Sequence, residues 1–268
     1  MKSADELKDI VKTKYGEIAR QGGSCCGPTG CGDTLGGTNF AESYKGLDGY
    51  FPEADLGLGC GIPTEYAGIE EGQTVIDLGS GAGNDVFVVR AIVGETGRAI
   101  GLDMVPDMVD KAKANAAKLD FDNVEFHLGE IEDMPLDSGI ADVLVSNCVL
   151  NLVPDKKRAF SEIHRVLKPG GHFCVSDIVL EGDLPDELAE AAIAYAGCVA
   201  GAQRKDEYMG TIKAAGFHDA VIRSTRQVHL PDQLLEEILG SERADFLKES
   251  GFGIYSITVV GYKESEES

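Results

Sequence analysis

Cysteine is the residue type in this sequence that offers the most chemistry. Seven cysteines occur in 268 residues, and four of them fall within the first 60. An odd number cannot pair completely into disulfides, and the N-terminus lacks the apolar core of a secretion signal. We therefore expect a cytoplasmic, reducing setting in which the thiols react or bind a ligand. The seven are Cys25, Cys26, Cys31, Cys60, Cys148, Cys174 and Cys198.

A glycine-rich turn at residues 77–83 (DLGSGAG) is the second candidate site. It follows a short apolar stretch at 74–77 and precedes a helical pattern that begins at Asn84. Glycines let the backbone turn sharply and approach a ligand closely. The third glycine comes too early for the phosphate-binding pattern G-x-G-x-x-G, and the expected basic side chain is missing. A pyrophosphate is therefore not the predicted ligand.

Carboxylates surround this turn. Asp77 stands directly before it, Asp103 ends the next predicted strand, and the segment 129–132 (GEIE) follows the third. The carboxyl ends of parallel strands meet at one edge of a sheet, where a carboxylate accepts hydrogen bonds from ribose hydroxyls. This combination suits a nucleoside without phosphates and tolerates a cationic one.

The elements that position these residues alternate between short apolar strands and helices. This alternation is typical of a parallel sheet covered on both faces. We predict an α/β fold with a doubly wound, seven-stranded, mostly parallel sheet, closed by an antiparallel hairpin at the sheet edge. The predicted strands are 74–77, 99–103, 124–128, 141–147, 172–179, 220–225 and 255–262, and the helices between the first five are 84–93, 106–119 and 155–167.

The two ends of the chain differ from this core. An amphipathic helix is predicted at 5–20, followed by a long irregular arm from Gly22 to Gly61. Beyond the fifth strand, helices are predicted at 185–196, 205–215 and near 231–239. The predicted divisions are an N-terminal helix and cysteine-rich arm at 1–64, a Rossmann-like core at 65–183, a cap with closing strands at 184–263 and an acidic tail at 264–268.

The charge balance argues against several classes of partner. Lys and Arg number 24 against 46 Asp and Glu, a net charge of −22. Binding to nucleic acid or to an anionic membrane depends on basic residues, so neither is expected. No apolar stretch is long enough to span a bilayer. The five histidines are scattered without an i, i+4 metal-binding pair. We expect the protein to be a monomer.

Several segments resemble the arsenite methyltransferases, within the S-adenosylmethionine-dependent methyltransferases of the seven-stranded type. DLGSGAGN, GLDM and the acidic end of the third strand resemble the wider superfamily. GCGIP near residue 60, SNCVLNLVPDK (146–156), RVLKPGG (165–171) and GCVAGA (197–202) resemble the arsenite methyltransferases specifically. The resemblance implies S-adenosylmethionine as cofactor. The expected cofactor-binding residues are Asp77, Gly79, Ser80, Gly81, Asp103, Met104, Gly129, Glu130, Ile131, Asn147 and Cys148.

The same resemblance implies that the substrate is trivalent arsenic, as arsenite or a thiol conjugate. It places arsenic on Cys148, Cys198 and Cys60, and one N-terminal cysteine completes a set of four thiols. Arsenic is soft and prefers thiolate ligands, and its lone pair can attack a sulfonium methyl group in line. Methylation formally oxidises arsenic. Neighbouring thiols could reduce it again by forming a disulfide, which thioredoxin or a small thiol would reset.

Some assignments near these cysteines stay open. Cys26 or Cys31 is favoured as the fourth thiol, but the group at 25–31 could instead load arsenic, form a regulatory disulfide or join Cys60 in a zinc site. Cys174 lies inside a predicted strand and is expected to fill the core. Members of the family often carry a tyrosine pair where this chain has Leu58-Gly59. Contact with the cofactor is therefore expected from the backbone there, or from Leu58.

Two other functions compete with arsenic methylation. One is methylation of an organic small molecule such as a quinone or thiol, which would need a deprotonating base that the sequence does not show. The other is a thiol-based metalloid or zinc-binding protein with a vestigial glycine turn. The intact set of Asp77, Asp103 and the GEIED segment argues against the second.

Overall fold

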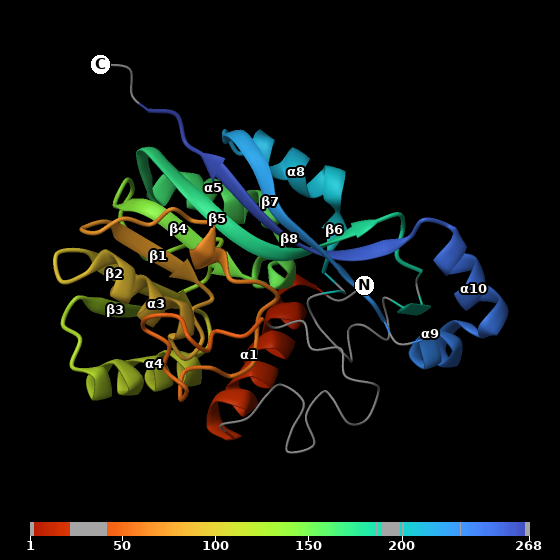
Figure 1. The fold of residues 1–268 in the computed structure, drawn as a ribbon, viewed down its shortest axis with the longest axis horizontal. Helices are drawn as coiled ribbons and strands as arrows, with labels where there is room; N and C mark the ends of the chain where they lie inside the picture. The colour runs from red at the N-terminus through yellow and green to blue at the C-terminus, as the bar shows by residue number, and fades with distance from the viewer. Residues whose placement is uncertain are drawn as a thin grey trace.

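An eight-stranded sheet forms the centre of the computed structural model, which describes residues 3–21, 42–185, 187–188, 199, 201–230 and 232–265. The strand order is β3-β2-β1-β4-β5-β8-β7, and the two-residue β6 pairs with β5 (Figure 1). All pairs are parallel except those of β8, which runs antiparallel to β5 and β7. The strands are β1 (Thr74–Leu78), β2 (Arg98–Asp103), β3 (Val124–Leu128), β4 (Ala141–Asn147), β5 (Leu167–Glu181), β6 (Gln203–Arg204), β7 (His218–Val228) and β8 (Gly253–Tyr262).

Helices cover both faces of the sheet, because alternate residues of each apolar strand point to opposite sides. On one face α3 (Asn84–Val93) and α4 (Pro106–Leu119) pack on a cluster that includes Val75. On the other face α5 (Lys156–Val166) and α8 (Lys205–Ala214) pack on a cluster that includes Ile76. The predicted doubly wound α/β sheet is confirmed.

Local signals account for several helix ends. Pro106 occupies the first turn of α4, where a missing N–H costs nothing. Asp155 caps α5, and its carboxylate accepts a hydrogen bond from the backbone N–H of Arg158. α3 is followed by Gly94, whose φ of +69° suits glycine. The bounds of α3 and α4 are those predicted from the sequence.

Two further regions extend beyond the sheet. α1 (Ala4–Gln21) packs on α4 through a small cluster in which Ile18 and Ala19 contact Val105 and Met108. α9 (Asp232–Leu239) and α10 (Ser241–Glu249) form a separate lobe at the far end of β7 and β8 (Figure 1). Within the described ranges, none of the helices has the length and apolar character needed to cross a membrane.

The C-terminal half differs from the prediction in three places. β5 begins at Leu167, so the Pro-Gly-Gly segment expected to separate helix from strand lies within the strand. The last two strands form an antiparallel pair at the edge of the sheet, as predicted, with β7 outermost, and α9 is the helix expected near 231–239. α10 and β6 were not predicted. Of the helix expected at 185–196, nearly all lies outside the described residues.

Candidate cofactor and thiol site

A cavity opens at the carboxyl ends of β1, β2 and β4, where the strand order reverses direction. Ligands bind at this position in open α/β sheets. The cavity encloses about 820 Å³ of space that protein atoms do not fill, including its open mouth. Eight of the predicted cofactor-binding residues line it: Gly79, Gly81, Asp103, Met104, Gly129, Ile131, Asn147 and Cys148.

The glycine turn is held against β2 by its own backbone. The N–H groups of Gly79 and Ser80 both donate to the carbonyl oxygen of Leu102, at 2.7 and 3.0 Å. Gly79 has a φ of +67°, and a Cβ atom there would overlap the side chain of Val149. Glycine is therefore required at this position both for its backbone conformation and for the close approach of the segment that follows β4.

Asp103 presents a carboxylate to this cavity from the end of β2. Its two oxygens accept hydrogen bonds from the backbone N–H groups of Gly81 and Val105, each at 2.9 Å. Burial raises the pKa of Asp103, and these backbone hydrogen bonds oppose that rise. Each carboxylate oxygen can accept a second hydrogen bond. The contact of Asp103 with a ribose hydroxyl stays a prediction.

Three predicted cofactor residues do not line the cavity. Asp77 is buried, and its pKa is raised well above the usual range by burial and by the charges of Asp85 and Asp103. Ser80 is buried in the turn. Glu130 forms ion pairs with Lys8 and Lys12 of α1, at 2.7 and 3.0 Å.

The N-terminal helix α1 forms part of the cavity wall through Lys8, Val11 and Tyr15. The sequence predicted this helix from its amphipathic pattern but did not indicate what it packs against. Lys8 also pairs with Glu132, another residue of the cavity wall, at 3.2 Å. The GEIED segment therefore contacts both the cavity and the helix beside it.

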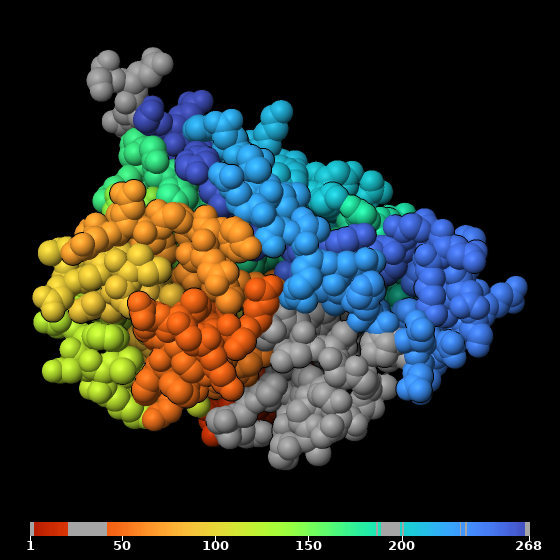
Figure 2. Space-filling model, viewed as in Figure 1, coloured from red at the N-terminus to blue at the C-terminus, as the bar shows by residue number. Residues whose placement is uncertain are grey.

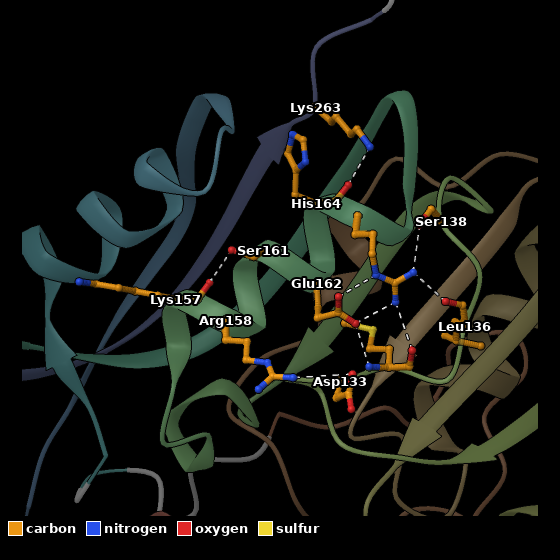
Figure 3. A network of polar contacts seen from close by, with 11 residues as sticks. Asp133, Leu136, Ser138, Lys157, Arg158, Ser161, Glu162, His164 and Lys263 are labelled. Carbon is orange, nitrogen blue, oxygen red and sulfur yellow. Dashed lines mark hydrogen bonds and ion pairs between the residues drawn. The ribbon is translucent and has the colours of Figure 1, made fainter.

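A polar network on α5 anchors the chain that follows β3. Arg165 donates to the backbone carbonyl oxygens of Met134 and Leu136, at 3.1 and 2.8 Å, and pairs with Glu162 at 2.7 Å. Glu162 in turn accepts a hydrogen bond from the N–H of Met134 at 2.8 Å. Figure 3 shows Glu162, Leu136 and Ser138 around the guanidinium group of Arg165, which contacts all three. The network fixes the segment next to Gly129 and Ile131, which line the cavity.

Two predicted substrate thiols, Cys60 and Cys148, belong to one buried apolar cluster. Cys148 also lines the cofactor cavity, so this cluster adjoins it. Cys148 follows β4 in a left-handed conformation, with a φ of +60°, and its N–H donates to the carbonyl oxygen of Ser176 at 2.7 Å. A non-glycine residue in this conformation is uncommon and is favoured at functional positions. Its neighbours in the cluster are Ile178, Leu180, Val199, Val228 and Ile254.

The backbone of Cys60 is tied to three strands. Its N–H donates to Asn147 Oδ1 at 2.9 Å, and its carbonyl oxygen accepts from Ser256 Oγ at 2.6 Å and Arg226 Nη2 at 3.0 Å. Arg226 also pairs with Glu42, which lies earlier in the arm. Figure 2 shows this arm segment, in orange, against light-blue β7. Leu58 and Gly59, next to Cys60, line the cavity.

The remaining cysteines fall into two groups. Cys174 is fully buried, its thiol donates to the carbonyl oxygen of Pro63 at 3.2 Å, and burial raises its pKa to about 12, which fits the core role expected for it. Within the part of the chain that the structure describes, no three His, Cys, Asp or Glu residues form a metal-binding group. Four predicted thiols lie outside the described residues: Cys25, Cys26, Cys31 and Cys198.

Asp177 of β5 is fully buried and accepts a hydrogen bond from the hydroxyl of Tyr208 at 3.1 Å. Burial raises the pKa of Asp177 to about 7, against the opposing effects of Lys156 and of the Tyr208 hydrogen bond. Burial and the charge of Asp177 raise the pKa of Tyr208 well above its usual range, and the charges of Cys60 and Cys148 add to this.

Comparison with known proteins shows which family the chain resembles. A family model described as a methyltransferase domain matches residues 69–216. The arsenite methyltransferase of Halobacterium salinarum is 40% identical over 80% of this chain and 58% of that protein. That of Homo sapiens is 30% identical over 89% of this chain and 65% of that protein. The chain thus spans less than two thirds of these curated relatives. A crystal structure of an arsenic(III) S-adenosylmethionine methyltransferase from Chlamydomonas reinhardtii is 31% identical, with a TM-score of 0.67, over 86% of this chain and 74% of that one.

Proposed function

Because this chain belongs to the arsenite methyltransferase family of S-adenosylmethionine-dependent enzymes, we propose that it transfers methyl groups from S-adenosylmethionine to trivalent arsenic held by cysteine thiolates. The observation that carries the proposal is the position of two thiols. Cys60 and Cys148 share one buried cluster, and Cys148 also lines the cavity at the sheet's switch point. A soft substrate on these thiols would lie next to a cofactor in that cavity.

The cavity residues fit the cofactor that the family implies. The Asp103 carboxylate is placed to accept ribose hydroxyl hydrogen bonds, and Gly79 and Gly81 keep the wall free of side chains. Leu58, Met104 and Ile131 supply apolar contact. When bound, S-adenosylmethionine supplies an electrophilic methyl group on a positively charged sulfur. The carboxylates at this edge of the sheet favour that charge.

The cysteines hold the substrate and set its direction of attack. Thiolates at Cys60 and Cys148, with Cys198 as the third, make a pyramidal arsenic site whose lone pair stays available for the methyl group. The arsenic lone pair would form the arsenic–carbon bond as the sulfur–methyl bond of S-adenosylmethionine breaks, with S-adenosylhomocysteine as the leaving group, and arsenic would become formally pentavalent. Two thiolates return two electrons by forming a disulfide, and Cys26 or Cys31 is the candidate for the fourth thiol. A dithiol donor such as thioredoxin would restore the reduced enzyme.

The test is arsenic speciation by chromatography with mass detection, after incubation with arsenite, labelled S-adenosylmethionine and a dithiol. We expect labelled mono- or dimethylated arsenic from the wild type and at least about 100-fold less from Cys148→Ser, because a misplaced nucleophile costs about two orders of magnitude. Cys174→Ser is the matched control, since serine can keep the hydrogen bond to Pro63. If the wild type binds the cofactor but produces no methylated arsenic, the substrate would instead be an organic small molecule.

A further inference from the structure

A chain of buried polar side chains connects α3 to the backbone of Cys60, and two of its members, Tyr44 and Asp85, have no part in the chemistry proposed above. Tyr44 and Asp85 are 2% and 8% exposed. The Tyr44 hydroxyl lies 2.8 and 3.0 Å from the two carboxylate oxygens of Asp85, and 2.8 Å from Asn147 Nδ2. Asn147 then contacts the backbone of Cys60. Three side chains, from the arm, α3 and β4, are therefore linked in one row that ends at the backbone of Cys60.

The Asp85 carboxylate determines the direction of the hydrogen bonds at the Tyr44 hydroxyl. Burial raises the pKa of Asp85, while its hydrogen bonds with Tyr44 and Asn147 oppose the rise. The Tyr44 hydroxyl lies within hydrogen-bond distance of both carboxylate oxygens, which is the geometry of a hydroxyl that donates to a carboxylate. The carbonyl oxygen of Gly61 is a more distant acceptor, at 3.3 Å. The single proton of the Tyr44 hydroxyl therefore points to Asp85, and the Tyr44 oxygen accepts from Asn147. This requirement directs the NH₂ group of Asn147 toward Tyr44.

The orientation of the Asn147 amide in turn determines what Cys60 can contact. With its NH₂ group toward Tyr44 and the carbonyl oxygen of Gly61 (2.7 Å), Asn147 presents Oδ1 to the N–H groups of Cys60 (2.9 Å) and Gly61 (3.3 Å). The reversed amide would set oxygen against the Gly61 carbonyl and NH₂ against two N–H groups. Buried polar groups left in that state are costly.

We propose that Asp85 and Tyr44 are positioning residues that hold the Cys60 thiol beside the cofactor cavity by orienting Asn147. The proposal rests on the proposed function, in which Cys60 is a ligand of arsenic. Asn147 suits this role because it lines the cavity and also binds the Cys60 backbone. A single amide thus relates the position of the thiol to that of the methyl donor.

Close packing prevents the Cys60 segment from absorbing a change in Asn147. Gly59 has a φ of +102°, and a Cβ atom there would lie 2.6 Å from Asn147 Nδ2. A Cβ atom on Gly61 would lie 2.6 Å from Ser176 Oγ. The backbone on both sides of Cys60 therefore lies directly against side chains of β4 and β5, so turning the amide would displace the cysteine.

Two near-isosteric variants test the row. Tyr44→Phe removes the hydroxyl, and Asp85→Asn lets a side-chain NH₂ donate to the Tyr44 oxygen, which turns the Tyr44 proton toward Asn147. In each we expect kcat for arsenic methylation to fall about tenfold or more, with the Kd for S-adenosylmethionine within about twofold of wild type. Tyr50→Phe is the control, because its hydroxyl also binds a carboxylate, that of Asp55, in the same arm.

A second measurement separates this proposal from the proposed function. Hydrogen exchange at the Cys60 and Gly61 amides should be about tenfold faster in Tyr44→Phe and Asp85→Asn, and unchanged in Tyr50→Phe. The double variant should be no worse than the single ones, because both break one row. If the wild type methylates no arsenic but the variants differ in exchange as described, the proposed function is overturned and the positioning role is kept. If the kcat and the exchange rates of Tyr44→Phe and Asp85→Asn equal those of wild type, the positioning role is overturned. Should one variant fail to fold, the other gives the answer.

Discussion

The cofactor cavity and the thiol cluster lie side by side but are assembled differently. Most of the cavity wall comes from segments that directly follow β1, β2, β3 and β4, and the glycine turn bonds to the neighbouring strand. The thiol cluster brings together the arm, the end of β4, and the strands β5, β7 and β8. The cavity therefore depends mainly on local strand-to-helix connections. The cluster needs the antiparallel strands at the end of the chain to be in place.

Asn147 belongs to both regions, because it lines the cavity and binds Cys60. Variants on either side of it should therefore affect one region and leave the other intact. Four predictions use this separation, and they run from the largest expected effect to the smallest.

Cys60→Ser should cause the largest effect. An alkoxide oxygen is a poor ligand for soft arsenic, so we expect methylation to fall at least about 100-fold and the arsenic bound per chain to drop. The Kd for S-adenosylmethionine should change less than about twofold. Arsenic content after gel filtration and calorimetric titration of the cofactor measure the two quantities. A loss of cofactor binding equal to the loss of arsenic binding would show that the two regions are not separable.

Asp177 should make the region near the thiols sensitive to pH. Its pKa is raised to about 7 in the folded protein, whereas an aspartate in the unfolded chain has a pKa of about 4. Between these two pH values Asp177 is protonated in the folded state and ionised in the unfolded state. The free energy of unfolding therefore falls as the pH rises toward 7. Asp177→Asn should remove this contribution, so its free energy of unfolding relative to wild type should rise by about 2 kcal/mol between pH 5.5 and pH 8.

Thermal unfolding of wild type and Asp177→Asn between pH 5.5 and 8 checks this sign. The difference between the two Tm values should widen as the pH rises and then level off above 7. A constant difference would show that Asp177 does not titrate in this range. The contributions of Asp77 and Asp85, whose pKa values are also raised, are present in both proteins and cancel.

Asp103→Asn should affect the opposite region. We expect about tenfold weaker binding of S-adenosylmethionine, because the amide loses the charge of the carboxylate and one of its accepting oxygens. The arsenic bound per chain should stay at the wild-type value. Asp107→Asn is the control, since that aspartate pairs with Arg20 at the surface. Unchanged cofactor binding in Asp103→Asn would place the ribose elsewhere.

Lys8→Met should have the smallest effect. Removing the ion pairs with Glu130 and Glu132 should weaken the docking of α1 by less than about 1 kcal/mol, and less at high salt. Hydrogen exchange of the α1 amides at two salt concentrations measures this change. Lys118→Met, which breaks a surface pair with Glu53, should leave α1 unchanged. Protection of α1 that is equal in both variants would mean that its apolar contacts alone hold it.

Much of the cavity could be predicted from short stretches of sequence. The glycine turn, the acidic ends of β2 and β3 and the bounds of α3 and α4 each depend on residues a few positions apart. Glycine and proline restrict the backbone locally, and apolar periodicity identifies buried strands and helices without knowledge of their partners. The position of α1 was not predictable in this way, because an amphipathic face does not specify what will cover it.

The sequence by itself determined the parallel core, the turn that borders the cofactor cavity and the identity of the candidate thiols. Only the tertiary structure decided that α1 forms a wall of that cavity and that β8 lies between β5 and β7. It also decided that Asp85, Tyr44 and Asn147 form the row that leads to Cys60. These contacts join residues that are 41 to 103 positions apart. Their partners are selected by the packing of whole elements, which no short pattern of residue types encodes.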